Sequence, residues 1–243
     1  MKQEIKDHRL TDAAFEEAAD HGGRMDPTHI VIHYSGGTAA GGIDWLTRQE
    51  RPPISAHVMI DRKGVITQMV PFNFVAFHAG RSSLGELREF NEFSIGIELE
   101  NWGPLDCQRG EFLTYTKRVI APEWVIEAKH RNTGWLWTQR PDYWHKFTCQ
   151  QEMACKDLCE ALVVEYGVVG IVGHDTIAPA RKFDPGPASA NLMAVLQGLT
   201  EEVSEDVPEP LHESRLVAHG GDEPEETDNA EVQTEDDSGE GGG

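Results

Sequence analysis

Residues 28–35 (THIVIHYS) are rich in β-branched and apolar side chains, and they decide how we interpret the fold. A strand that is covered on both faces has this composition, because neither face meets water. Residues 94–99 (SIGIEL) form a second run of the same kind. Two more short runs, 57–61 and 65–70, flank Arg62-Lys63-Gly64, which is typical of a hairpin turn. These segments predict a sheet whose inner strands are buried.

Helices are expected to cover this sheet. Residues 148–166 have apolar side chains at helical spacing, with a capping box that begins at Thr148 and a stop signal at Gly167. Residues 168–172 are predicted to form a further strand, and residues 187–199 a final helix that begins with proline. This order of strands and helices predicts an α/β fold, a single domain with a central mixed β-sheet flanked by helices.

Composition divides the chain into an N-terminal extension (1–27), a main domain (28–199) and a C-terminal tail (200–243). The tail holds sixteen acidic residues, one arginine and no aromatic residue, so we expect it to be disordered and solvated. Residues 103–146 fit the domain pattern poorly and are predicted to be an insertion, for instance an extra hairpin. This insertion contains four of the six tryptophans: Trp124, Trp135, Trp137 and Trp144. We favour the interpretation that its aromatic side chains pack against the domain; a wall that faces a glycan is the alternative.

Charge and hydropathy exclude several classes of protein. The formal net charge is −21, and the absence of a basic surface argues against a partner made of nucleic acid. No run approaches the roughly 18 apolar residues of a membrane span, and the charged first 20 residues do not resemble a secretion signal. We therefore expect a cytoplasmic monomer that does not bind a membrane. In a reducing compartment, Cys155 and Cys159 are expected to be small core residues of a helix rather than zinc or redox groups.

The histidines are better candidates for chemistry than the cysteines. His33 ends the first buried run, His174 follows the strand 168–172, and Asp184 comes ten residues later. Two imidazoles and one carboxylate suit a zinc site whose fourth position is open to water, as in catalytic sites. Asp175 is a competing carboxylate for the ligand role, and Asp184 would alternatively only cap the helix that follows it.

Two further charged residues have positions that suit catalysis. Lys182 precedes Asp184 by two residues, so in an extended segment its ammonium group would lie beside a metal at Asp184. A solvent-facing lysine is the alternative that base rates favour. Glu98 falls in the buried run 94–99, where a charge is costly unless it is paired or functional. A carboxylate that points toward a metal is what a general base requires.

Several short motifs follow one another along residues 28–199, apart from the insertion. They are His33-Tyr34-Ser35, Ser55-Ala56-His57, Ile60-Asp61-Arg62-Lys63-Gly64, Gln68-Met69-Val70-Pro71, His78-Ala79-Gly80, Asn91 with Ser94-Ile95-Gly96-Ile97-Glu98, and the segments 173–179 and 181–187. The ordered set resembles the zinc-dependent N-acetylmuramoyl-L-alanine amidases (amidase type 2), whose fold is shared with peptidoglycan-recognition proteins.

The resemblance implies a reaction and a role for single residues. The reaction is hydrolysis of the amide between N-acetylmuramic acid and L-alanine in peptidoglycan or its fragments. The implied zinc ligands are His33, His174 and Asp184. Glu98 corresponds to the catalytic glutamate of the family and Lys182 to its catalytic lysine. His57 and His78 are expected near the cleft, as structural or substrate-lining residues.

The resemblance leaves the biological role open. A cytoplasmic enzyme that recycles soluble muropeptides is one expectation, and a phage or prophage endolysin that reaches the cell wall through a holin is the other. Three other classes are alternatives to the enzyme. They are a non-catalytic peptidoglycan-binding module of the same fold, a regulatory protein that binds RNA polymerase, and an acidic protein with a structural zinc.

Overall fold

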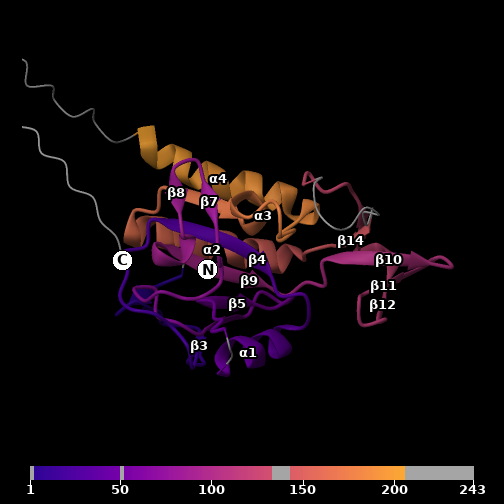
Figure 1. The fold of residues 1–243 in the computed structure, drawn as a ribbon, viewed down its shortest axis with the longest axis horizontal. Helices are drawn as coiled ribbons and strands as arrows, with labels where there is room; N and C mark the ends of the chain where they lie inside the picture. The colour runs from indigo at the N-terminus through magenta and orange to yellow at the C-terminus, as the bar shows by residue number, and fades with distance from the viewer. Residues whose placement is uncertain (1–2, 50–51, 133–142, 206–243) are drawn as a thin grey trace, which may run out of the picture. The chain divides into compact units, whose positions relative to one another are not determined.

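The computed structural model describes residues 3–49, 52–132 and 143–205, without the side chains of residues 202–205. Trp135, Trp137 and nearly all of the predicted acidic tail lie outside these residues. In the described part, the central sheet has six strands in the order β15-β4-β9-β5-β6-β3; Figure 1 labels four of them, β4, β9, β5 and β3. The six strands are β3 (Ala14–Phe15), β4 (His29–Tyr34), β5 (Val58–Ile60), β6 (Ile66–Gln68), β9 (Ser94–Leu99) and β15 (Gly170–Gly173).

The central sheet is mixed, as the sequence predicts. Strands β15, β4, β9 and β5 are parallel, β5 and β6 form the predicted antiparallel hairpin, and β3 adds to β6 in parallel. The register sets His33 of β4 opposite Glu98 of β9. Side chains that are opposite one another on neighbouring strands point to the same face of the sheet. The register therefore puts a candidate metal ligand and the candidate general base on one face.

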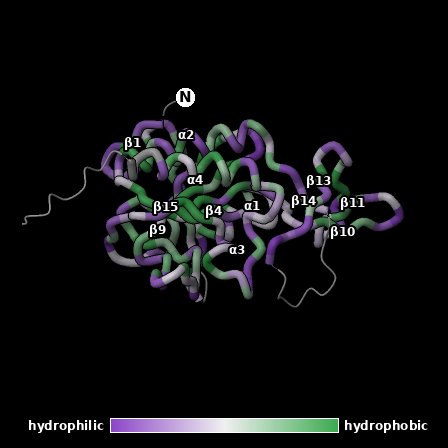
Figure 2. The backbone as a smooth tube through the Cα atoms, turned by 90° about the horizontal axis from the view of Figure 1, so that it is seen from above, coloured by the Kyte–Doolittle hydropathy of each residue, from purple (hydrophilic) through white to green (hydrophobic). Residues whose placement is uncertain are grey.

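Helices cover both faces of the sheet. On one face, α2 (Cys149–Tyr166) and α4 (Ala190–Glu205) pack on alternate residues of β4 such as Ile30 and Ile32. On the other face, α1 (Ala39–Thr47) packs on Met59 of β5, and the short α3 (His174–Ile177) packs on Val31 of β4. Figure 2 shows the resulting hydrophobic character of β4 and β15. Because both faces are covered, the inner strands can be apolar at nearly every position.

Helix α2 forms where the sequence predicts it. The Thr148 hydroxyl accepts the Gln151 N–H, the capping box is complete, and Gly167 ends the helix with a positive φ of 64°. Cys155 and Cys159 are buried free thiols in its apolar face, as expected. The final helix is a short 3-10 turn, Pro187–Ser189, followed by α4, which continues beyond the predicted end to Glu205.

The insertion forms a small sheet of its own, larger than the single hairpin that we expected. The described residues of the insertion form five antiparallel strands in the order β12-β11-β10-β14-β13. They are β10 (Pro104–Gln108), β11 (Glu111–Leu113), β12 (Val119–Ile120), β13 (Val125–Glu127) and β14 (Tyr143–His145), with a 3-10 turn at Pro122–Trp124. Trp144 is buried and packs against Gly186, where a Cβ would lie only 2.8 Å from the indole ring. This contact agrees with the favoured interpretation that tryptophan packs the insertion against the domain.

Much of the predicted N-terminal extension packs on the main domain. Its first two strands, β1 (Ile5–Lys6) and β2 (Arg9–Leu10), pair with each other, and β3 joins the edge of the central sheet. Leu10 is buried, and its N–H donates to Gln68 Oε1 at 2.8 Å. A small hairpin of β7 (Ser83–Leu84) and β8 (Leu87–Arg88) and a 3-10 turn at Phe90–Glu92 precede β9. Among the described helices, none has the length and apolar character needed to span a membrane.

Candidate active site

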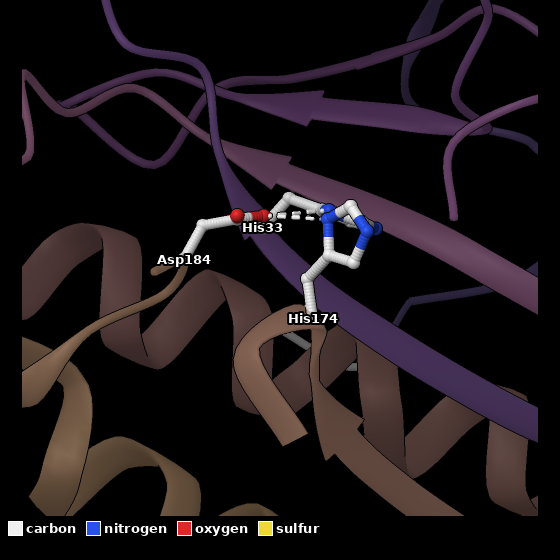
Figure 3. A group of neighbouring side chains, drawn as sticks. All are labelled: His33, His174 and Asp184. Carbon is white, nitrogen blue, oxygen red and sulfur yellow. Dashed lines mark hydrogen bonds and ion pairs between the residues drawn. The ribbon is translucent and has the colours of Figure 1, made fainter. Parts of the chain in front are cut away.

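His33, His174 and Asp184 meet at the carboxyl ends of β4 and β15 (Figure 3). His33 is the penultimate residue of β4, His174 follows β15 directly, and Asp184 lies in the loop before the final helix. The Nδ1 atoms of both imidazoles lie 2.9 Å from the same oxygen, Oδ2 of Asp184. All three residues are buried, and their potential ligand atoms lie within 4.8 Å of one another.

Hydrogen bonds on the far side of the two rings indicate where the ring protons lie. His174 Nε2 is 3.0 Å from the carbonyl of Ala79, which accepts only, so this nitrogen carries the proton. His78 Nε2 donates in the same way to the carbonyl of Ser94 at 3.2 Å. The Nδ1 of His78 is then an acceptor, and His33 Nε2 donates to it at 3.0 Å. Both His33 and His174 therefore point an unprotonated Nδ1 at Asp184.

The three converging atoms are all acceptors, which favours a bound cation. Burial, together with the charge of His174, lowers the pKa of His33 to about 4, so this ring is neutral at pH 7. Two imidazoles that point unprotonated Nδ1 atoms at one carboxylate form a donor set that suits zinc.

Asp175, the competing carboxylate, does not join this cluster. Its Oδ2 lies 3.2 Å from His130 Nε2, and its Oδ1 accepts from the guanidinium of Arg131. The carboxylate that the structure brings to His33 and His174 is that of Asp184.

Glu98 is held beside the cluster with one oxygen unused. Among the described residues, its Oε2 is buried and has no hydrogen-bond partner. Burial and the charge of Asp184 raise the pKa of Glu98, the charge of Lys182 lowers it, and together they bring it to about 8. A buried oxygen without a partner is costly to keep. Its position next to the candidate ligands suits a group that accepts a proton.

Lys182 borders the same cleft as Asp184, in agreement with the two-residue spacing. Its charge lowers the pKa of both His33 and Glu98, which indicates that the ammonium group lies near both side chains. Lys182 is half-buried and lines the cleft, so it is not a lysine that faces bulk solvent alone.

The two remaining predicted histidines have different positions. His78 borders the cleft and hydrogen-bonds His33, and burial lowers its pKa well below the usual value. His57 does not line the cleft, so of its two expected roles the structural one describes it and the substrate-lining one does not. Its ring is fully buried, and both ring nitrogens are satisfied there. Nδ1 accepts from the N–H of Gly96 at 3.0 Å, and Nε2 donates to the carbonyl of Phe74 at 2.9 Å.

The candidate ligands lie in a cleft of about 1020 Å³. The residues that line it include Trp45 of α1, Trp102, and Tyr115 of the insertion. Sequence reasoning missed Trp45, although Thr38, which caps α1, was a usable signal for this helix. It also missed Arg181, whose guanidinium borders the cleft and donates to the carbonyls of Ala79 and Arg81.

The family profile and the curated relatives that match this chain are all N-acetylmuramoyl-L-alanine amidases. The profile of the N-acetylmuramoyl-L-alanine amidase family Amidase_2 matches residues 23–187. The 1,6-anhydro-N-acetylmuramyl-L-alanine amidase AmpD of Citrobacter freundii is 34% identical over 137 residues, 56% of this chain and 52% of that protein. The N-acetylmuramoyl-L-alanine amidase AmiD of Escherichia coli is 28% identical over 167 residues, 65% of this chain and 48% of that protein. The chain thus spans about half the length of the curated relatives that it matches.

Solved structures agree with the sequence comparison. A crystal structure of an AmpD derivative is 25% identical, covers 79% of this chain and 98% of its own, and has a TM-score of 0.56. A complex of E. coli AmiD with anhydro-N-acetylmuramic acid-L-Ala-D-gamma-Glu-L-Lys is also 25% identical, covers 80% of this chain and 65% of its own, and has a TM-score of 0.50. Because the family profile matches most of the chain and includes all three clustered residues, the chain belongs to the N-acetylmuramoyl-L-alanine amidase family.

Proposed function

We propose that this chain is a zinc-dependent amidase that hydrolyses the amide between N-acetylmuramic acid and L-alanine in peptidoglycan or its fragments. The observation that carries the proposal is the convergence of His33 Nδ1, His174 Nδ1 and Asp184 Oδ2 beside Glu98, whose Oε2 has no partner among the described residues. Two curated relatives are named as amidases of this class, and one solved relative holds an anhydro-muramoyl peptide. These names support the substrate class.

His33, His174 and Asp184 would hold the zinc, and His78 would keep His33 in the tautomer that ligation requires. Zinc in such a site supplies Lewis-acid chemistry to a carbonyl and to water. Glu98 Oε2 accepts a proton from the attacking water and returns it to the departing nitrogen of L-alanine. It is free to do so because no other described residue occupies it.

Lys182 contributes positive charge where negative charge develops on the scissile carbonyl oxygen. Groups of this kind contribute roughly 3 kcal/mol to transition-state stabilisation in comparable sites. The half-buried position of Lys182 at the cleft favours this role over a contact with bulk solvent.

The experiment that tests the proposal is mass spectrometry of the products from two substrates, intact sacculi and soluble anhydro-muropeptides, each with and without a zinc chelator. The proposal predicts free stem peptides that disappear on chelation. Release from the soluble substrate alone supports a recycling role, whereas release from sacculi supports an endolysin. A chain that binds zinc and releases no peptide from either substrate would contradict the enzyme and leave a recognition module.

A further inference from the structure

Segment 130–132 of the insertion contacts loop 174–184, whose two ends are the candidate ligands His174 and Asp184. The centre of this contact is Asp175, the buried carboxylate next to His174. The following inference rests on the zinc site of the proposed function. It concerns how the contact between the insertion and loop 174–184 affects the positions of the ligands.

His130 is held at both of its ring nitrogens. The N–H of Asn132 donates to His130 Nδ1 at 2.9 Å, so the ring proton lies on Nε2. That Nε2 is 3.0 Å from the carbonyl of Phe183 and 3.2 Å from Asp175 Oδ2. The ring also stacks on Trp144, with centroids 5.6 Å apart. His130 thus presents one fixed donor to both ends of the loop.

Arg131 and Asn132 complete the contact. The guanidinium of Arg131 donates to Asp175 Oδ1 and to the hydroxyl of Thr176. Asn132 Nδ2 donates to the carbonyl of Asp175 at 2.9 Å and lies 3.4 Å from the carbonyl of Lys182. Residues 130–132 therefore hydrogen-bond backbone or side-chain groups of the loop next to His174 and next to Asp184.

The loop passes this constraint to the ligands through its backbone. The N–H of Asp175 donates to the carbonyl of Asp184 at 2.7 Å, which ties the two ends of the loop together. Asp175 Oδ1 is also packed so closely on Gly173 that a Cβ there would lie 2.6 Å away. A displacement of Asp175 would consequently move both His174 and Asp184.

We propose that segment 130–132 and Asp175 form a clamp that positions His174 and Asp184 for zinc and keeps the carboxylate of Asp175 out of the ligand set. Neither Asp175 nor Arg131 borders the cleft, so both act through the ligands rather than on substrate. Groups that orient ligands from outside the coordination shell commonly change metal affinity by roughly 10- to 100-fold. Metal affinity is therefore the direct readout of the clamp.

The test compares zinc affinity, measured by competition with a chromophoric chelator, in five full-length chains. They are the wild type, Arg131→Ala, Arg131→Lys, Asp175→Asn and the control Lys129→Ala. Arg131→Ala and Asp175→Asn are expected to bind zinc at least roughly tenfold more weakly. Arg131→Lys keeps the positive charge and is expected to recover most of the affinity. Lys129 is an exposed neighbour outside the clamp, so its replacement should leave affinity unchanged.

The absorption spectrum of the cobalt-substituted chains is a second readout, because it reports ligand geometry directly. The clamp predicts a changed cobalt spectrum in Asp175→Asn, and a lower kcat with little change in KM in Arg131→Ala. Arg131 has a side chain that is 60% exposed, so Arg131→Ala is expected to fold.

The clamp is wrong if folded Arg131→Ala and Asp175→Asn bind zinc within twofold of the wild type and keep its cobalt spectrum. A wild-type chain that binds zinc but cleaves no substrate contradicts the proposed reaction and leaves the affinity comparison valid. A wild-type chain that binds no zinc contradicts both proposals.

Discussion

At the scale of single residues, the chemistry depends on where protons lie. The hydrogen bond from His33 to His78 leaves His33 Nδ1 without a proton, and the carbonyl of Ala79 does the same for His174. Glu98 complements these ligands, since its buried Oε2 has no partner among the described residues. Burial is the main cause of the raised pKa of Glu98; the charge of Asp184 raises this pKa as well, and the charge of Lys182 lowers it. In the proposed mechanism, ligation and proton transfer are therefore assigned to different residues.

The substitution Glu98→Gln tests proton transfer. It keeps the shape of the side chain but removes the base, so kcat should fall by at least about 100-fold, as for other general acid–base residues. Zinc content should stay at the wild-type value, because Glu98 is not among the clustered ligand residues. Peptide release and metal analysis on the same preparation measure the two quantities. Turnover within tenfold of the wild type would remove Glu98 from the mechanism.

The substitution Lys182→Met tests the role of positive charge. It preserves an unbranched chain of similar length, and we expect a loss of roughly 3 kcal/mol in transition-state stabilisation, about 100-fold in kcat/KM. Zinc affinity should not weaken, since an ammonium group beside the ligands repels the metal. Steady-state kinetics with a soluble muropeptide and a zinc competition assay measure both effects. Unchanged kcat/KM would assign Lys182 to the cleft wall alone.

At the scale of elements, the parallel pairing of β15, β4 and β9 brings the site together. The long elements were predictable, since buried strands β4 and β9 and helix α2 carry apolar patterns and capping residues. Helix α1 was not predicted, because glycines at positions 41 and 42 weaken its helical signal. Strand β3 has only two residues and owes its place to pairing with β6 rather than to a pattern. The positions of helix α1 and strand β3 therefore depend on tertiary contacts rather than on a local sequence pattern.

His57 joins two elements, because its ring hydrogen-bonds both β9 and the segment after β6. Its buried ring also predicts how the stability of the fold depends on pH. Burial lowers its pKa to about 4, compared with 6.5 for an ordinary histidine. The unfolded chain therefore binds a proton between pH 6.5 and 4 that the folded chain does not. Across this window the free energy of unfolding should fall as the pH falls, by about 3 kcal/mol for this one group.

Urea denaturation with a chelator present, at several pH values between 4 and 7, measures this dependence. His57→Gln cannot titrate, so its free energy of unfolding should change less steeply with pH than that of the wild type. Buried histidines that do not contact His57 contribute equally to both chains and cancel in the comparison, whereas the pKa of His78 is lowered in part by His57. Identical slopes would show that the ring of His57 is not held neutral in the folded chain.

At the scale of the whole molecule, the three ligand atoms join parts of the chain that are far apart in sequence, so zinc should stabilise the folded state. The sequence could predict His33, His174 and Asp184 because β4 and β15 end at the same edge of the sheet. It could not predict the contact of His130, which depends on how the insertion packs, and no spacing along the chain relates it to Asp175.

This linkage predicts a change in thermal stability. With free zinc at 100 times its Kd, the folded chain should gain about 2.7 kcal/mol, which for a domain of this size raises Tm by roughly 5–10 °C. His33→Ala should show no such rise, because it lacks a ligand. Calorimetry of both chains with zinc and with a chelator measures the shift. An equal rise in His33→Ala would place the zinc elsewhere.

The most direct test of the central claim is a crystal of the zinc-loaded chain measured at the zinc absorption edge. The account predicts one anomalous peak, about 2.0–2.2 Å from His33 Nδ1, His174 Nδ1 and a carboxylate oxygen of Asp184. The absence of a peak at this position, or a zinc held by Asp175 in place of Asp184, would contradict it.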